Sequence, residues 1–312
     1  MSFSSEVKEE LTEYVPRGRH CLIAELTAII VICGRVRITE TGKYRLFIHT
    51  ENIYTVKKYS ILLEKAFGIT GEVSIRKNIE KNTLIYTILV KNDLAKEVLS
   101  GIKLVNKDGE IRDDYSLVSN LIVQNSCCKK AFIRGAFLAA GSMGDPEKSY
   151  HLEIVVGNSL AGEELIEILS KLGLKAKLVQ RKNHYPVYIK ESDTLAEFLG
   201  ITEAHKSLMK FENIRIVKDV KNKVNRKVNC ETANIKKTAS AAAKQLDDIY
   251  YLQKINKLEK LPDGLRELAK LRMEYPDATL KELGGLLEEP IGKSGVNHRL
   301  NRISQIAQDN RL

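Results

Sequence analysis

An internal repeat is the feature that most limits how this sequence can fold. The string Tyr44-Arg-Leu-Phe-Ile-His-Thr-Glu-Asn52 returns as Tyr150-His-Leu-Glu-Ile-Val-Val-Gly-Asn158, with Tyr, Leu, Ile and Asn recurring at a spacing of about 106. Each copy has the pattern of a strand, and each follows an apolar helical stretch that ends in glycine. A repeat of this length predicts that one supersecondary unit is used twice.

The elements after each of these strands also recur. Each is followed by an amphipathic helix with a glycine cap, a second strand pair and a short closing helix. The expected helices cover 22–34, 61–68, 132–141 and 168–173, the strand pairs are 72–76 with 84–90 and 176–179 with 185–189, and the closing helices begin near Asp93 and Asp193. The order helix, two strands, helix, two strands, helix therefore occurs twice, which predicts an α+β fold class.

The first helix of each repeat is small or apolar on nearly every face, as 26–34 and 133–141 show. A helix of this kind must be buried all round. Two such helices can bury each other by packing side by side, with the two sheets flanking them as a saddle. Small residues that allow this close approach are Ala28, Gly135, Ala136, Ala139 and Ala140.

These features resemble the LAGLIDADG homing-endonuclease fold in its single-chain, two-repeat form. The resemblance covers about the first 200 residues, and Phe132-Ile-Arg-Gly-Ala-Phe-Leu-Ala-Ala-Gly141 is the best match. It implies that the acid before the final glycine of each motif would hold the catalytic divalent metal. Cys33 and Ala140 occupy those positions, and neither can ligate Mg²⁺. Asp145 and Glu40 fall beyond the glycines, so we expect no catalytic residues and keep an active homing endonuclease only as the least favoured alternative.

The positive charge is concentrated in one stretch. Residues 206–260 carry 14 basic and 6 acidic side chains, against 28 and 26 in 1–205 and 8 and 8 in 261–312. Such a cluster is what binding to a phosphate backbone requires, although a solvated basic linker between domains would have the same composition. The backbone-contact candidates are Lys218, Lys221, Lys223, Arg226, Lys227, Lys236 and Lys237.

The carboxy-terminal part has the pattern of a helical domain. A helix is expected over about 232–258, with Ile235, Ala239, Ala242, Leu246, Ile249 and Tyr250 near 3.6 spacing. A second helix restarts at Pro262 and Asp263, and Thr279 with Glu282 has the spacing of a capping box. A turn over 289–293 and a last helix capped by Ser294 and running to about Gln308 complete a helix-turn-helix. The expected domains are 1–205, with repeats at about 20–105 and 126–205, a basic linker over 206–230, and an all-α helix-turn-helix domain over 231–312.

The last helix has two chemically different faces. Val296, Leu300, Ile303 and Ala307 share one stripe and are expected in the core. The remaining surface carries side chains that can read base edges, since Arg pairs with guanine and Asn or Gln with adenine. An ordinary polar surface is the alternative interpretation. The expected DNA contacts are Lys293, Ser294, Asn297, His298, Arg299, Asn301 and Arg302.

Taken together, the two halves resemble the WhiA family of bacterial sporulation and cell-division regulators. Local strings that carry this resemblance are 2–8, 144–153, 225–234 and 293–300. The resemblance implies a non-enzymatic, sequence-specific regulator of transcription, chromosome segregation, cell division or sporulation. Its expected partners are double-stranded DNA and other transcription or cell-division proteins. A ligand- or partner-sensing role for the saddle and RNA binding stay open as alternatives.

Cysteine, histidine and hydropathy supply only negative expectations. Cys21, Cys33, Cys127, Cys128 and Cys230 include no C-x-x-C pair, and the six His are scattered, so we expect no metal and no cofactor. These cysteines are expected to be reduced and mostly buried in cores. Neither a membrane helix nor a targeting sequence is expected, which places the protein in the cytoplasm, associated with the nucleoid.

Overall fold

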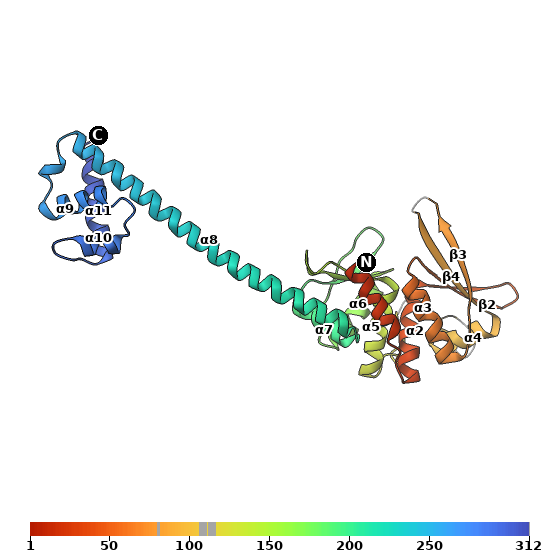
Figure 1. Cartoon of the computed structure of the whole chain (residues 1–312). Helices are drawn as coiled ribbons and strands as arrows, with labels where there is room; N and C mark the ends of the chain where they lie inside the picture. The colour runs from red at the N-terminus through yellow and green to blue at the C-terminus, as the bar shows by residue number, and fades with distance from the viewer. Residues whose placement is uncertain (80–81, 106–110, 112–116, 312) are drawn as a thin grey trace. The chain divides into compact units, whose positions relative to one another are not determined.

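The computed structural model describes residues 1–79, 82–105, 111 and 117–311, and it divides into two units, Met1–Lys218 and Asp219–Leu312 (Figure 1). Each unit has its own buried core. Within the described ranges, no helix combines the length and the apolar character that crossing a membrane requires.

The first unit contains the same order of elements twice, which confirms the α+β two-repeat prediction. Each repeat forms a four-stranded antiparallel sheet, with order β1-β2-β4-β3 in one and β5-β6-β8-β7 in the other. The first repeat comprises α2 (Arg19–Cys33), β1 (Gly34–Ile38), β2 (Tyr44–Thr50), α3 (Ile53–Phe67), β3 (Glu72–Asn78), β4 (Thr83–Lys91) and α4 (Asn92–Gly101). The second comprises α5 (Ser126–Ala140), β5 (Gly141–Met143), β6 (Leu152–Val156), α6 (Ser159–Ser170), β7 (Lys177–Leu178), β8 (Tyr185–Ile189) and α7 (Ser192–Ile201).

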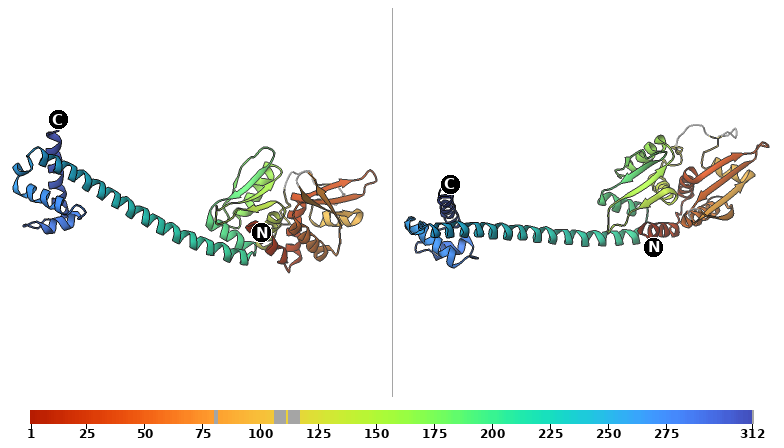
Figure 2. Two further views of the ribbon diagram at one scale, coloured as in Figure 1. Left: turned by 45° about the horizontal axis from the view of Figure 1, so that its top comes forward. Right: turned by 90° about the horizontal axis from the view of Figure 1, so that it is seen from above.

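Helices α2 and α5 pack against each other at the centre of this unit, with one sheet on each side of the pair (Figure 2). The expected close approach is confirmed at Gly135, where a Cβ would lie 2.3 Å from the carbonyl oxygen of Glu25. Glycine is also required where each helix turns into its strand. A Cβ on Gly34 would lie 2.2 Å from the Ile30 oxygen, and one on Gly141 would lie 2.6 Å from the Phe137 oxygen.

Three charged side chains are buried in this helix layer. Glu25 Oε1 lies 3.0 Å from Lys58 Nζ and 3.0 Å from Arg134 Nε, and all three side chains are at most 3% exposed. Burial lowers the pKa of Lys58, and the adjacent Glu25 carboxylate opposes that shift. Since an unpaired charge is costly in such surroundings, these residues tie α3 to both central helices.

A helix that the sequence analysis did not predict, α1 (Phe3–Glu13), packs on this unit and organises the start of α8 (His205–Lys254). The Glu10 carboxylate accepts hydrogen bonds from the backbone N–H groups of Lys206 and Ser207, at 2.6 and 2.9 Å, and from the Ser207 hydroxyl at 2.7 Å. These are backbone donors that the first turn of a helix leaves without partners. Glu10 therefore caps α8 in place of a residue of α8 itself.

Helix α8 begins earlier than the sequence pattern indicates. It was expected from about Thr232, after a basic linker over 206–230, but it runs without a break from His205 to Lys254. The sequence holds no Gly or Pro in this range, so nothing interrupts the backbone hydrogen bonds. The apolar face proposed for 235–250 is also only partly correct, because Ile235 is 68% and Tyr250 is 50% exposed.

The second unit closes around a short 3₁₀ turn, η1 (Leu258–Lys260), and three helices, α9 (Asp263–Glu274), α10 (Leu280–Leu286) and α11 (Lys293–Asp309). The capping box of Thr279 and Glu282 is confirmed at the start of α10. A Cβ on Gly284 would lie 2.2 Å from the Ile291 oxygen, so glycine permits the tight turn between α10 and α11. The predicted helix-turn-helix with a preceding support helix is therefore present.

Candidate nucleic-acid interface

Helix α11 has the two faces that the sequence predicted. Its core stripe is confirmed, since Val296, Leu300, Ile303 and Ala307 are at most 1% exposed. Six of the seven side chains proposed to contact DNA project from this helix as exposed groups: Lys293, Ser294, Asn297, His298, Asn301 and Arg302. The helix therefore presents a continuous row of donors and acceptors to solvent.

Two details of α11 differ from expectation. The helix starts at Lys293 with Gly292 as its N-cap, because the Gly292 oxygen already accepts from the Val296 N–H, so Ser294 is not the cap. Arg299 is half-buried and its Nη1 donates to the Gly264 oxygen of α9 at 3.4 Å. A wheel at 100° per residue explains this difference, because position 299 lies beside the core stripe and away from Asn301.

The seven basic residues of α8 proposed as backbone contacts fall into two groups. Lys221, Lys223, Arg226, Lys227, Lys236 and Lys237 are all exposed. Lys218 is half-buried, and its Nζ donates to the Pro146 oxygen at 3.1 Å and lies 4.5 Å from the centroid of the Tyr150 ring. Lys218 is therefore already engaged within the first unit, whereas the other six are available to phosphates.

A second basic surface, which the sequence analysis did not identify, lies on the exposed face of the first sheet. Arg35 is paired with Phe47 and Arg37 with Arg45 in the register of β1 and β2. Arg35, Arg37 and Arg76 line a hollow of about 490 Å³ together with Phe47 and His49. Burial is the main cause that lowers the pKa of His49, and the positive charge of these three arginines lowers it further. The alternation of Arg35 and Arg37 in the sequence was the signal that could have indicated this face.

The corresponding face of the second sheet has mixed charge. Glu153 of β6 accepts from Arg181 Nη1 at 3.2 Å, and its Oε2 lies 3.2 Å from His151 Nε2. The acid offsets the positive charge of its neighbours, so this surface lacks the concentrated positive charge of the first sheet.

The ends of α2 and α5 lack the carboxylates that a metal-dependent nuclease would use. Cys33 Sγ donates to the Ala139 oxygen at 3.5 Å, and the nearby Lys8 Nζ donates to the Leu138 oxygen at 3.3 Å. Burial lowers the pKa of Lys8 to about 8 and raises that of Cys33 to about 11. Asp145 and Glu40 are exposed and lie outside the helix pair, in the loops after β5 and β1.

Side chains that can ligate a metal meet instead at the opposite, amino-terminal ends of the same two helices. The donor atoms of His20, Cys21, Cys127 and Cys128 all lie within 4.8 Å of one another. The five cysteines are free thiols, but Cys127 and Cys230 are exposed, so the expectation that they mostly fill cores is only partly correct.

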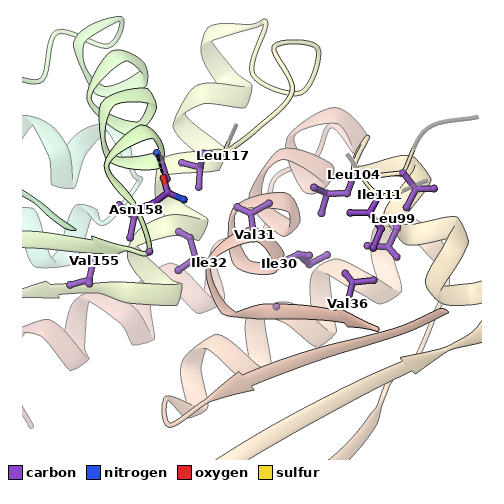
Figure 3. A pocket seen from close by; sticks show the side chains of 15 residues that line it. Ile30, Val31, Ile32, Val36, Leu99, Leu104, Ile111, Leu117, Val155 and Asn158 are labelled. Atoms are coloured by element: carbon purple, nitrogen blue, oxygen red, sulfur yellow. Dashed lines mark hydrogen bonds between the residues drawn. The ribbon is translucent and has the colours of Figure 1, made fainter. Parts of the chain in front are cut away.

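An apolar pocket of about 340 Å³ lies between the two repeats of the first unit. Figure 3 shows Val31 and Ile32 of α2 in its middle, with Asn158 on the side of the second repeat and Leu99 and Leu104 on the side of the first. The Asn158 Oδ1 is already used, because it accepts from the Ala161 N–H at 2.8 Å at the start of α6. The pocket therefore offers mainly apolar contacts.

The chain has two saddle-forming repeats that lack carboxylates at their motif ends, and a helix-turn-helix unit follows them. This combination defines a class of LAGLIDADG-like proteins that carry a helix-turn-helix. Three family models match: the WhiA N-terminal LAGLIDADG-like domain over residues 19–105, the WhiA LAGLIDADG-like domain over 129–221 and the WhiA C-terminal HTH domain over 224–307. The chain belongs to the WhiA family.

Relatives and solved structures agree with this assignment. "Probable cell division protein WhiA" of Lachnoclostridium phytofermentans is 48% identical over 309 residues, covering 98% of each chain. The protein of the same name from Clostridium acetobutylicum is 42% identical over 312 residues, covering 99% of this chain and 98% of the relative. The crystal structure of full-length DUF199/WhiA from Thermatoga maritima has a TM-score of 0.60 at 25% identity and covers 99% of both chains.

Proposed function

We propose that this protein is a non-enzymatic, sequence-specific regulator that binds double-stranded DNA and acts in cell division, chromosome segregation or sporulation. The observation that carries the proposal is the exposed row on α11, since a helix-turn-helix inserts its last helix into the major groove. The names of the relatives support the biological setting. Binding to chromosomal DNA would associate the protein with the nucleoid in the cytoplasm.

Base reading is assigned to the amino-terminal half of α11. Ser294, Asn297, His298 and Asn301 are the proposed base contacts, with Lys293 and Arg302 shared between bases and phosphates. Arg299 ranks below these residues, because its guanidinium already bonds to the Gly264 oxygen. Its side chain would have to release that bond before it could reach a base.

The six exposed candidates on α8, Lys221, Lys223, Arg226, Lys227, Lys236 and Lys237, are proposed to add affinity without reading sequence. Each phosphate that a Lys or Arg neutralises releases counterions, so their contribution falls as salt rises. The arginine face of the first sheet is proposed as an additional, weaker backbone contact. Positive charge in these places suits any nucleic-acid sequence, which leaves discrimination between sequences to α11.

The absence of enzymatic activity is proposed from the helix ends. A thiol and a methyl group stand at 33 and 140, and the Lys8 amino group lies close to the Cys33 end. A cationic amine there opposes Mg²⁺ rather than binding it. Protein purified free of contaminating nucleases and incubated with Mg²⁺ or Mn²⁺ should leave supercoiled plasmid intact, and cleavage that survives stringent purification would overturn this part of the proposal.

The DNA-binding proposal is tested by comparing one variant on two duplexes. Footprinting on genomic fragments first defines a preferred site. Asn301→Ala should then weaken binding to that site by about ten- to a hundredfold, the loss expected for one bidentate base contact, while binding to a scrambled duplex changes little. Gln253→Ala, which removes an exposed amide from α8, is the matched control and should change neither affinity.

The same titration decides between base reading and phosphate contact. If Asn301→Ala weakens both duplexes equally, α11 does not discriminate between bases. Titrations with single-stranded DNA and RNA complete the experiment, because a preference for either over duplex DNA would contradict the helix-turn-helix assignment.

A second candidate function, a sensor in the saddle, is favoured by the apolar pocket between the repeats. Its volume is within the roughly 300–1,000 Å³ typical of small-molecule sites. The fluorescent apolar probe 1-anilinonaphthalene-8-sulfonate should bind the protein there. Ala161→Phe should fill the space beside α6 and reduce this binding, whereas equal fluorescence from both proteins would argue against the sensor.

A further inference from the structure

Four side chains that can ligate a metal, three thiols and one imidazole, converge at the amino-terminal ends of α2 and α5. The Nδ1 atom of His20 lies 3.2 Å from Cys128 Sγ, 3.3 Å from Cys21 Sγ and 3.9 Å from Cys127 Sγ. They come from segments more than a hundred residues apart, and packing of the two central helices brings them together. No part of the proposed DNA-binding function uses them.

The internal repeat explains why the four donors meet. His20 and Cys21 are the second and third residues of α2, and Cys127 and Cys128 are the second and third residues of α5. Each repeat therefore contributes the same two helix positions. Packing the helix pair side by side places these positions opposite one another, so the site follows from the symmetry of the fold.

The distances fit a tetrahedral ion. An ion about 2.3 Å from sulfur and about 2.0–2.1 Å from nitrogen holds those two atoms roughly 3.5 Å apart in tetrahedral geometry. The three His20-to-sulfur distances, 3.2 to 3.9 Å, bracket this value. Two sulfur atoms bound in the same way would be about 3.8 Å apart, and all four donors lie within 4.8 Å of one another.

The surroundings also suit a metal ion with thiolate ligands. Two helix amino termini direct their partial positive charge at the donors. Burial raises the pKa of Cys21 and Cys128, so these thiols lose their protons only when an ion displaces them. A Cβ on Gly18 would lie 2.8 Å from His20 Nε2, so glycine at this position leaves room for the imidazole to fold back with Nδ1 facing the thiols. Cys21 and Cys128 are buried while His20 and Cys127 are exposed, which gives an ion a path of entry.

We propose that His20, Cys21, Cys127 and Cys128 bind one Zn²⁺ ion that fastens together the amino-terminal ends of the central helix pair. Three sulfurs and one nitrogen are a donor set that selects zinc over magnesium or calcium. Four protein ligands leave no open coordination position, so the ion is structural and not catalytic. The site lies at the opposite end of the helices from the positions where a LAGLIDADG nuclease would hold its metals.

The direct test measures metal in the full-length protein. The full-length protein, purified under reducing conditions with zinc supplied, should contain about one Zn²⁺ per chain, as a closed four-ligand site implies. Inductively coupled plasma mass spectrometry measures this content. Exchange for Co²⁺ should produce thiolate-to-cobalt charge transfer and the intense visible bands of a tetrahedral ion. If the purified protein contains no zinc and the addition of Co²⁺ produces no such bands, the proposal is wrong.

Variants locate the ion. Cys127→Ser and His20→Ala change exposed ligands, so both proteins should fold, and zinc retained after dialysis against a chelator should fall about tenfold or more. Cys230→Ser is the matched control, because this exposed cysteine lies on α8, outside the cluster. Equal zinc in Cys127→Ser and Cys230→Ser would contradict the assignment.

A stability measurement separates a structural ion from incidental binding. Removing the metal should lower the melting temperature of the wild-type protein and of Cys230→Ser, but leave that of Cys127→Ser unchanged. If thiol titration of unreduced protein instead finds two thiols lost and no zinc, the cluster is a disulfide-forming pair and the zinc proposal fails. The outcome does not depend on DNA binding, so the two proposals stand or fall separately.

Discussion

Corresponding surfaces of the two repeats carry different chemistry on the same strand order. The exposed face of the first sheet gathers Arg35, Arg37 and Arg76 around one hollow, and Glu72 at its edge is bonded to Lys91. On the second sheet, Glu153 lies between His151 and Arg181. Charge on the outer face is therefore independent of the strand order, and one half of the saddle gathers arginines around a hollow while the other pairs its basic groups with an acid.

Polar positions on equivalent helices diverge in the same way. In the first repeat, the Asn52 cap starts α3, and Lys58 six residues later reaches the Glu25 carboxylate. In the second, Asn158 starts α6, and Glu164 six residues later accepts from the Leu117 N–H at 2.8 Å. Equivalent helix positions thus hold opposite charges, because each is matched to a different partner. The difference shows that backbone packing defines the repeat and that polar partners are specific to each half.

The largest effect is expected from removing the acid that only the first repeat supplies. Glu25→Ala leaves Lys58 and Arg134 buried without their counter-charge, which should lower the free energy of unfolding by about 3–5 kcal/mol. Glu153→Ala removes a partly exposed acid from the second sheet and should cost less than about 1 kcal/mol. Urea denaturation of both variants measures the contrast, and similar losses would show that the buried cluster has no special role.

A smaller effect, with a defined pH dependence, is expected at the helix ends that hold Cys33 in one repeat and Ala140 in the other. Burial lowers the pKa of Lys8 from 10.5 to about 8. Between these values the unfolded chain binds more protons than the folded chain, so stability rises with pH. Below pH 8 the buried charge destabilises the fold by at most about 3 kcal/mol, before its hydrogen bond to the Leu138 oxygen is counted.

Lys8→Met tests this directly, because it removes the charge at every pH. The stability of the variant minus that of the wild type should be most positive below about pH 8 and should decrease as the pH rises toward 10.5. Denaturant midpoints at a series of pH values measure it. A difference that stays constant across this range would mean that Lys8 titrates normally in the folded chain.

The smallest effect is expected on DNA affinity at the two sheet faces. Replacing Arg35, Arg37 and Arg76 with Ala should reduce the slope of log K against log salt by roughly one unit for each phosphate that the variant no longer neutralises. The matched triple replacement of Lys177, Arg181 and Lys190 in the second repeat should leave the slope unchanged. Equal changes in the two variants would remove the proposed functional difference between the sheets.

The repeat and the helix-turn-helix could be predicted because local sequence determines them. Recurring Tyr, Leu, Ile and Asn mark the two strands, and the capping box at Thr279 marks the start of α10. Helix α1 was missed because it is short and rich in charge. The first half of α8 was missed because Val220, Val224 and Val228 are more than half exposed, so no buried face produces a clear period.

The parts of the candidate sites that depend on tertiary contacts could not be predicted. A helical wheel places position 299 beside the core stripe, but only the packing of α9 shows that the Arg299 guanidinium bonds to the Gly264 oxygen. The His20 and Cys127 donors are equally invisible to a search for closely spaced ligands, because each helix supplies only two adjacent residues. Finding such a site from sequence requires superposing the two repeats before looking for donors.

The glycines that end α2 and α5 affect how sequences of related proteins should be interpreted. Both are required by the backbone, since a Cβ at either position would collide with the carbonyl oxygen of the preceding turn. Selection for a stable saddle will therefore retain them in proteins that cut DNA and in proteins that do not. A search based on these glycines therefore finds proteins that share the backbone shape, and the proposed loss of nuclease chemistry must be sought at the residue immediately before each glycine.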